Sequence, residues 1–239
     1  MIVLGLDTSG YANAIGVVDG KKVLADNTFE ARTDSLEKIV TNIEDTLRSA
    51  GLTLKDVTGI GVGLGPGSWT GIRVGVTLGK MLAYSTGKPV GGVPTLEALA
   101  YTAGNEASQI CSIISAGIKD TVYAGFYHAL DGNIARTGEY YVGDVRELAE
   151  RVGESTVLVG SEAESYCTII GQALDLSKIS IKAVEAAPNG SVVALLAASR
   201  LKRGESDDVL SLTPLYLKES TARAFINRYA VNAQIKGQV

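Results

Sequence analysis

The sequence contains few of the side chains that metal sites and nucleophilic active sites use most. Its 239 residues include one histidine and two cysteines. A metal site with two histidine ligands is therefore excluded, and no Ser–His–Asp arrangement can be assembled around His128, which lies in a predicted strand and is expected to be structural. Cys111 and Cys167 form neither a metal-ligand spacing nor a disulfide framework, so we expect both to be reduced core residues.

Long apolar runs and an excess of basic residues are also missing. There is no run of about 18 apolar residues, and no charged N-terminal region followed by an apolar segment, so we expect a soluble, cytoplasmic protein without a membrane partner. The net charge of −4 argues against a broad nucleic-acid-binding surface on this chain alone. The length is sufficient for one large domain or two small ones with a real core.

Glycine, by contrast, is abundant, and it is concentrated between Gly59 and Gly79. The first part of this stretch alternates apolar residues with glycines, which predicts a strand. Pro66-Gly67-Ser68 then breaks the strand, and an apolar run from Gly71 to Tyr84 predicts a helix, with Ser68 or Thr70 as its N-cap. The unit is a strand, a glycine-rich turn and a helix.

Such a unit can bind an anion, because a helix N-terminus presents N–H groups and a positive dipole end. The standard phosphate motifs nevertheless do not match. No Gly-Lys-Ser/Thr tripeptide occurs, the third glycine of the dinucleotide pattern is replaced by Thr70, and Ser68 lacks a Gly-x-Ser-x-Gly frame. A phosphate turn and a tight turn that only allows close packing both remain open.

Small residues recur every four positions along the predicted helix 71–84, at Gly71, Gly75, Gly79 and Ala83. They form a smooth stripe on one side, while apolar residues spread around the rest of the circumference. A helix of this kind is buried on more than one side. We expect one side to cover a sheet and the other to meet a second helix, which belongs either to this chain or to a partner.

The hydrophobic pattern predicts the order βββαβαβα over residues 1–103. Asp19-Gly20 indicates a hairpin between the second and third strands. Asp34 with Glu37 resembles a capping box at the start of a helix that runs to Ala50 and ends at Gly51. The predicted elements are strands at 2–6, 11–18, 21–31, 59–65 and 90–93 and helices at 34–50, 71–84 and 96–103.

The pattern then restarts near residue 104 as a second, less regular copy. Its predicted strands lie at 109–115, 122–130, 134–142, 157–159 and 179–184, and its helices at 145–152, 163–173 and 190–202. Duplicated βββαβα units with mixed sheets indicate a two-domain α/β fold. We assign residues 1–103 to an N-terminal domain that is completed by helix 190–203 and segment 204–217, residues 104–189 to a smaller second domain, and residues 218–239 to an extension.

Three consecutive strands with the turn Asp7-Thr8-Ser9 after the first resemble the opening of the actin-like ATPase superfamily, which has a ribonuclease H-like fold. In that superfamily such a turn lies under the nucleotide phosphates, and its aspartate can orient a metal-bound water. A plain Asx-turn at Asp7 is an equally good interpretation.

The segment Gly65-Pro66-Gly67-Ser68-Trp69-Thr70-Gly71-Ile72-Arg73-Val74-Gly75 closely resembles the TsaB (YeaZ) family, in which phenylalanine is usual at the position of Trp69. Four further segments share the resemblance, namely 6–9, 50–56, 93–100 and 214–217. The first half of the chain and the closing motif match well, whereas residues 104–210 match mainly in layout.

The resemblance implies a non-catalytic subunit of the complex that forms N6-threonylcarbamoyladenosine at position 37 of ANN-decoding tRNAs. The related TsaD subunit is its expected partner, and carries the metal and the threonylcarbamoyl-adenylate. This chain itself is expected to require no cofactor. A TsaE-like ATPase is expected to join the assembly, tRNA to be bound only through the complex, and the chain to form a homodimer when alone.

Residue by residue, the resemblance implies contacts through helices of the N-terminal domain. The expected interface residues are Leu36, Ile39, Val40, Ile43, Gly71, Ile72, Gly75, Val76, Gly79 and Ala83. The expected vestigial phosphate turns comprise Asp7, Thr8, Ser9, Gly65, Gly67, Ser68 and Thr70. The aspartate that relatives carry after the first strand of the second domain is missing here, unless Asp120 replaces it in a shifted register.

Two other functions are alternatives to this expectation. A free-standing actin-like ATPase or phosphotransferase would use Asp7 to position water and the Gly65–Thr70 turn to hold phosphate. A peptidase, a function once attached to relatives, has no residues to support it. The tail after residue 217 is partly basic, with Arg223, Arg228 and Lys236, and is interpreted either as a frayed terminus or as a docking segment.

Overall fold

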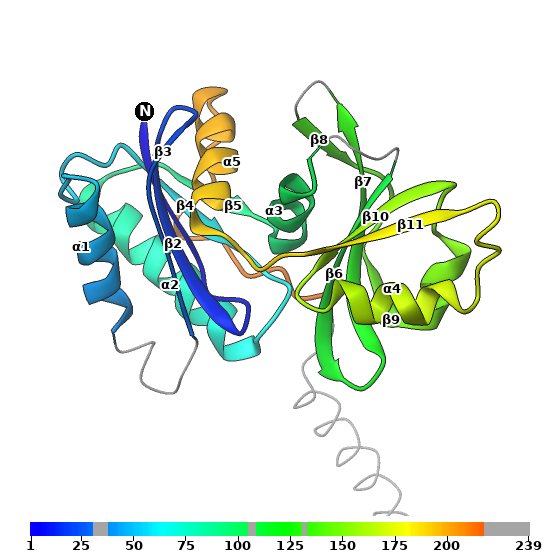
Figure 1. Ribbon diagram of the computed structural model, residues 1–239. Coiled ribbons are helices and arrows are strands. Elements are labelled where there is room, and N and C mark those ends of the chain that lie inside the picture. The colour runs from blue at the N-terminus through cyan, green and yellow to red at the C-terminus, as the bar shows by residue number, and fades with distance from the viewer. Residues whose placement is uncertain (31–37, 105–108, 131–132, 218–239) are drawn as a thin grey trace, which may run out of the picture.

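The computed structural model describes residues 1–30, 38–104, 109–130 and 133–217, which form two lobes, each built on a mixed β-sheet (Figure 1). This is the two-domain, ribonuclease H-like α/β architecture that the duplicated pattern predicts. Within the described ranges, no helix has the length and apolar character needed to cross a membrane.

The first lobe contains a five-stranded sheet with the order β3-β2-β1-β4-β5. Its strands are β1 (Ile2–Asp7), β2 (Ala12–Asp19), β3 (Lys22–Glu30), β4 (Gly59–Gly63) and β5 (Val90–Val93). The first three strands are antiparallel neighbours, and β1, β4 and β5 run parallel. The carboxyl ends of β1 and β4 therefore lie side by side, which brings the two predicted turns to one edge of the sheet.

Helices cover both faces of this sheet (Figure 1). On one face, α1 (Ile39–Ser49) and α2 (Trp69–Thr86) bury apolar side chains against the branched residues of the strands. On the other face lies α5 (Gly190–Lys202), whose small residues Ala194 and Ala197 pack against Val3 and Val93. The sheet is thus enclosed on both sides, as its nearly continuous burial requires.

The glycines in the strands are explained by the close approach of α5. A Cβ atom on Gly61 would lie 2.8 Å from the Cβ of Ala197, and one on Gly5 would lie 2.9 Å from the Cα of Ala194. A Cβ on Gly16 would overlap the backbone of Ser191. Glycine is favoured inside a strand where another backbone comes this close.

The second lobe contains a six-stranded sheet with the order β11-β10-β6-β7-β8, and β9 also pairs with β7. Its strands are β6 (Gln109–Ile118), β7 (Thr121–Leu130), β8 (Asn133–Arg136), β9 (Tyr141–Asp144), β10 (Ser155–Gly160) and β11 (Ser180–Glu185). The helix α4 (Ala163–Gly171) and the 3₁₀ helix η1 (Val145–Glu150) cover one face, with Leu148 and Ile170 in the core.

Two predictions for this lobe were wrong in detail. The single strand expected at 134–142 is divided into β8 and β9, because Gly138 has a φ of 76° and turns the chain between them. The helix expected at 145–152 is the shorter η1, capped by the Asp144 side chain, which accepts a hydrogen bond from the Arg146 N–H. The capping box predicted at Asp34–Glu37 lies outside the described residues.

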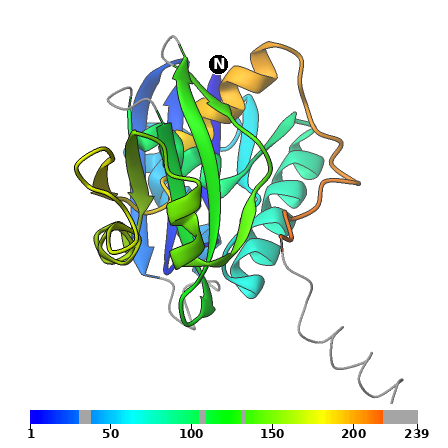
Figure 2. The same ribbon diagram turned by 90° about the vertical axis from the view of Figure 1, so that its right-hand side faces the viewer.

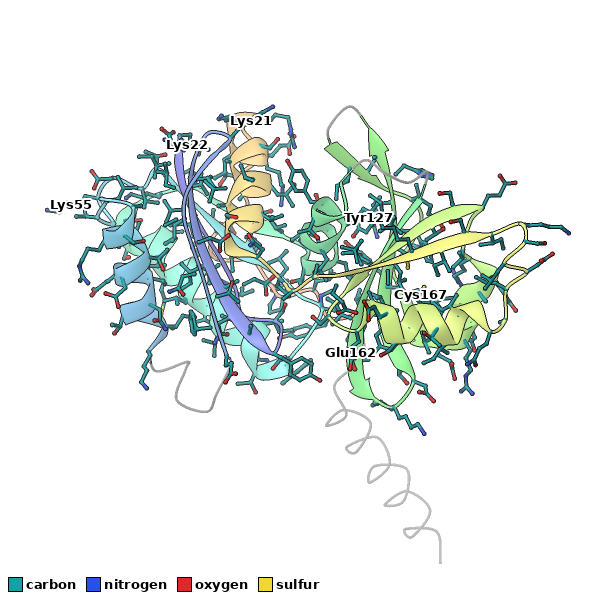
Figure 3. All side chains as sticks on the ribbon, in the orientation of Figure 1. Lys21, Lys22, Lys55, Tyr127, Glu162 and Cys167 are labelled. Atoms are coloured by element: carbon teal, nitrogen blue, oxygen red, sulfur yellow. The ribbon has the colours of Figure 1, made fainter. Side chains whose placement is uncertain are left out.

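The helix α3 (Thr95–Thr102) lies between the lobes, where Leu96 and Ala100 pack against Ile110, Tyr127 and Val159 of the second sheet. Tyr127, labelled in Figure 3, comes from β7 and belongs to this contact.

After α5, residues 204–217, called the strap below, return along the first lobe. The strap pairs with the edge strand β5 through Asp207, whose N–H donates to the Val90 carbonyl at 2.9 Å. It then runs beside α2 (Figure 2) and reaches the contact between the lobes with Leu217.

The close approach of α5 leads to a stability prediction. We expect Gly16→Ala to lower the free energy of unfolding by about 1–3 kcal/mol or more, because the new methyl group overlaps backbone atoms of α5 that cannot move aside alone. Gly171→Ala, at the end of α4, is the matched control: no atom lies within 4 Å of its added Cβ. Urea denaturation of the three chains would measure the difference, and equal losses for both variants would contradict this account.

Candidate functional site

The first candidate site is the pair of turns at the carboxyl ends of β1 and β4. Such an edge of an α/β sheet is where ligands usually bind. Asp7, Thr8 and Ser9 lie here and are 0%, 2% and 3% exposed. The turn after β4 leads into α2, whose N-cap is Ser68, which accepts a hydrogen bond from the Gly71 N–H at 3.3 Å.

The Asp7 carboxylate is occupied by donors from its own chain. Its Oδ1 accepts a hydrogen bond from the Ser9 N–H at 2.8 Å, and its Oδ2 accepts one from the Thr95 hydroxyl at 2.7 Å. Gly63 leaves room for this carboxylate, because a side chain there would overlap it. Burial raises the pKa of the Asp7 carboxyl above its usual value, although the hydrogen bonds from Ser9 and Thr95 act in the opposite direction.

The two turns are also joined to each other by hydrogen bonds. The Ser68 N–H donates to the Ser9 carbonyl at 2.7 Å, and the Thr8 hydroxyl donates to the Gly71 carbonyl at 2.6 Å. A side chain at Gly67 would overlap the Ser9 carbonyl. A phosphate at this edge would therefore have to displace existing contacts, and the geometry favours close packing of two turns.

The glycine stripe of α2 faces its own sheet, which corrects one expectation about the interface. A Cβ on Gly71 or Gly75 would overlap Thr8, and one on Gly79 would lie 3.1 Å from the Val62 Cβ. Ala83 is 1% exposed. The stripe allows α2 to approach β1 and β4, so these four positions are not on the surface of this chain.

Most of the other expected interface residues are also buried. Ile39, Ile43, Ile72 and Val76 are 3%, 4%, 2% and 3% exposed and pack within the first lobe, whereas Val40 is 53% exposed. Leu36 lies outside the described residues. Of the described residues expected at the interface, only Val40 is exposed.

The outward faces of α1 and α2 instead carry a different apolar surface. A groove of about 310 Å³ lies between these helices and is lined by Ile39, Arg73, Val74, Thr77, Leu78 and Met81. Beside it, Met81 and Tyr84 are 63% and 74% exposed. The sequence does carry a signal for this surface, because these side chains lie on α2 away from its glycine stripe.

The strap is fastened to this same helix. The Lys80 ammonium donates to the carbonyls of Leu210 and Leu212 at 3.0 and 2.9 Å. The Arg73 Nε donates to the Tyr216 hydroxyl at 3.0 Å, and the Tyr216 ring lies 4.5 Å from the Trp69 ring. The guanidinium of Arg73 also lies 4.3 Å from the centre of the Trp69 ring. Arg73 therefore contacts both the groove and the strap.

The remaining candidates do not converge on one place. His128 is exposed on β7, and Asp120 lies in the hairpin turn between β6 and β7 with a φ of 56°. Burial raises the pKa of the Cys111 thiol to about 12, as expected for a core residue. No group of three His, Cys, Asp or Glu side chains with metal-site geometry occurs among the residues that the structure describes.

The two lobes and their mixed sheets define the class of protein as a two-domain α/β protein with a ribonuclease H-like fold. A solved ROK hexokinase from Thermus thermophilus shares this fold, with a TM-score of 0.52 and 18% identity over 85% of this chain and 100% of that one. YeaZ from Pseudomonas aeruginosa has a TM-score of 0.76 at 23% identity, covering 90% of this chain and 99% of that one.

The family model "TsaD: tRNA N6-adenosine threonylcarbamoyltransferase" matches residues 29–224, and the chain belongs to this family. The tRNA threonylcarbamoyladenosine biosynthesis protein TsaB of Bacillus subtilis is 27% identical over 94% of this chain and 97% of that protein. The tRNA N6-adenosine threonylcarbamoyltransferase of Tropheryma whipplei is 36% identical over 43% of this chain but only 29% of that protein. The resemblance to the TsaB (YeaZ) family is thereby confirmed.

The buried carboxyl predicts a pH dependence. Because the pKa of Asp7 is raised in the folded state, the folded chain binds more protons above pH 3.8, and the contribution of Asp7 to stability falls as the pH rises towards the raised value. Asp7→Asn has no such titration. We expect wild type to lose stability relative to Asp7→Asn across this window in urea denaturation series. If the stability of wild type and of Asp7→Asn changed equally with pH, the raised pKa of Asp7 would be contradicted.

Proposed function

We propose that this chain is a non-catalytic, activating subunit of the complex that forms N6-threonylcarbamoyladenosine at position 37 of ANN-decoding tRNAs. Its family membership and its likeness to TsaB support a role in the biosynthesis of this modification. The observation that carries the proposal is the outward apolar face of α1 and α2, with Val40, Met81 and Tyr84 exposed beside the groove.

In this proposal, the outward face binds a TsaD-like catalytic subunit. Exposed apolar patches on a soluble protein are typical of protein–protein contacts, and Met and Tyr are common among interface residues. The partner supplies the metal and the threonylcarbamoyl-adenylate, a TsaE-like ATPase joins the assembly, and tRNA binds only through the complex. In the absence of the partner, the same face pairs two copies of the chain.

The composition of the chain supports an accessory role. One histidine cannot provide the two-histidine ligand set expected of the catalytic relatives. The Asp7 carboxylate, which would have to orient a metal-bound water, already accepts hydrogen bonds from Ser9 and Thr95. Each oxygen keeps a second lone pair, but Asp7 is 0% exposed, so neither oxygen is accessible to a substrate or metal in this arrangement.

Met81→Asp tests the docking face. We expect binding to the TsaD-like partner to weaken by at least about 30-fold, because an unpaired carboxylate would be buried in an apolar contact. Met81 is 63% exposed, so the stability of the isolated chain should change little. Leu176→Asp is the matched control, since Leu176 is 60% exposed on the second lobe.

Titration calorimetry with the purified partner would measure these affinities, and formation of the modified nucleoside in a reconstituted reaction should decline in parallel. Equal affinities of Met81→Asp, Leu176→Asp and wild type would remove α2 from the interface and leave the proposal without its carrying observation.

The alternative is a free-standing ATPase or phosphotransferase that uses Asp7 and the Gly65–Thr70 turn. Its support is the position of Asp7 beside a parallel strand, at the sheet edge where ligands usually bind. We expect no heat from Mg-ATP added to the isolated chain. Micromolar binding that Asp7→Asn abolishes would instead favour the alternative.

A further inference from the structure

We propose that Arg73 is a carboxylate-binding residue in the groove between α1 and α2, and that the TsaD-like partner places there a helix whose aspartate or glutamate pairs with it. The inference rests on the function proposed above, because it names the chemistry by which that partner is recognised. Three features lead to it: the composition of the groove, the unpaired guanidinium of Arg73, and the contacts that hold this guanidinium in place.

The composition of the groove defines the surface that would complement it. Among the described residues that line it, Arg73 is the charged one, and the others are apolar apart from Thr77. From Arg73 to Met81 the groove follows α2 for about 12 Å, or two helical turns. An amphipathic helix typically fills a groove of this kind. The complementary helix is therefore apolar along this length and carries a negative charge at the Arg73 end.

The guanidinium of Arg73 has no anionic partner within the described ranges of the chain. Its Nε donates to the Tyr216 hydroxyl at 3.0 Å, and its terminal nitrogens form no hydrogen bond or ion pair with a described residue. The side chain is exposed. The N–H groups that remain form the planar fork that pairs with both oxygens of a carboxylate.

Contacts with two aromatic rings hold this guanidinium in place. Its central carbon lies 4.3 Å from the centre of the Trp69 ring and 5.9 Å from the centre of the Tyr216 ring. The strap is fixed beside these rings, since the Leu215 N–H donates to the Leu64 carbonyl at 2.9 Å. An arginine that is already ordered in this way loses little conformational freedom when it binds a partner.

A carboxylate of a protein fits this site better than a phosphate of RNA. Binding along a nucleic-acid backbone uses several basic residues, whereas the described lining of the groove offers one basic residue among apolar side chains. An apolar contact also excludes water, which strengthens a single well-aligned ion pair. Arginine is accordingly common among the residues that contribute most to protein–protein binding.

Arg73→Leu removes the charge and is the first test. We expect its affinity for the purified TsaD-like partner, measured by titration calorimetry, to fall by at least about 30-fold, because the partner's carboxylate would be buried without a counter-charge. Arg151→Leu is the matched control, for which we expect no change: Arg151 is also exposed and lies 4.9 Å from the centre of a tyrosine ring, that of Tyr141, but in the second lobe. Urea denaturation of each variant distinguishes a loss of binding from a loss of fold.

Two further variants separate the geometry of the guanidinium from its charge. Arg73→Lys keeps the charge but removes the planar fork and its stacking on Trp69, so we expect a loss of affinity of about ten-fold. Tyr216→Phe keeps the ring but removes the hydroxyl that accepts a hydrogen bond from the Arg73 Nε, so we expect a smaller loss of about three-fold. Wild-type affinity of both variants would overturn the role of an ordered fork.

The amine introduced by Arg73→Lys also identifies the paired carboxylate. In the complex, a water-soluble carbodiimide activates carboxyl groups and joins them to amines at ion-pair distance through an amide bond, which mass spectrometry locates. We expect position 73 to be joined to an aspartate or glutamate of the partner, and Arg151→Lys to give no such product. Arg73→Glu should abolish binding, and replacement of the located carboxylate by arginine should restore it.

Three results would overturn the proposal. The first is an affinity of Arg73→Leu for the partner equal to that of wild type. The second is cross-linking of position 73 only to carboxylates of a second copy of this chain, which would make the groove a contact between copies. The third is weaker tRNA binding by the complex of Arg73→Leu with no change in partner affinity, which would make the anion a phosphate.

Met81→Asp separates this inference from the proposed function. If Met81→Asp weakens partner binding and Arg73→Leu does not, the docking face stands and the carboxylate-binding role of Arg73 is overturned. If neither variant weakens binding, the partner does not dock on this face, and the proposed function loses its carrying observation as well.

Discussion

The structure of the first lobe depends on how closely α5 lies on its sheet. Gly5, Gly16 and Gly61 provide a face without side chains, and Ala194 and Ala197 provide a helix surface almost as smooth. Close contact between two such surfaces gains dispersion energy over many atoms, although few large side chains take part. The contact between the sheet and α5 also leaves no room for added side-chain atoms. The glycines of three strands and the small residues of one helix are therefore all required by this one contact.

On the opposite face of the sheet, small residues likewise allow α2 to lie close to the strands. This close packing determines which side chains of α2 are exposed. Because Gly71, Gly75 and Gly79 face Thr8 and Val62, the large side chains of α2 lie on its flanks and outward side. Met81 and Tyr84 are exposed for this reason. Burial of the stripe against the sheet and exposure of an apolar surface are two consequences of one helix sequence.

Most elements could be predicted because their periodicity is strong, and helix 190–202 was predicted with the bounds that the structure has. The strand at 134–142 was wrong because alternation does not reveal that Gly138 adopts a positive φ and divides it. Proximity of the turns at Asp7 and Ser68 follows from two parallel strands. Their mutual hydrogen bonds do not, since they depend on side-chain positions that only the folded chain defines.

The glycine stripe shows the limit of such reasoning most clearly. A repeat of four small residues indicates that some backbone comes close, but it does not say which one. The prediction placed a second helix there, of this chain or of a partner, whereas the atoms in contact belong to β1 and β4. The hydrogen bonds from Lys80 to the strap could not be predicted either, because their acceptors are backbone carbonyls, which every residue has.

The position of α5 in the chain has a consequence for synthesis on the ribosome. The strands that it covers are complete by Val93, but α5 begins only at Gly190. At roughly 5–20 residues per second, about 5–20 s pass between these points. Throughout this interval the glycine-bearing face of the nascent sheet lacks its cover, and the second lobe emerges in the meantime. The first lobe therefore begins to form first but is completed last.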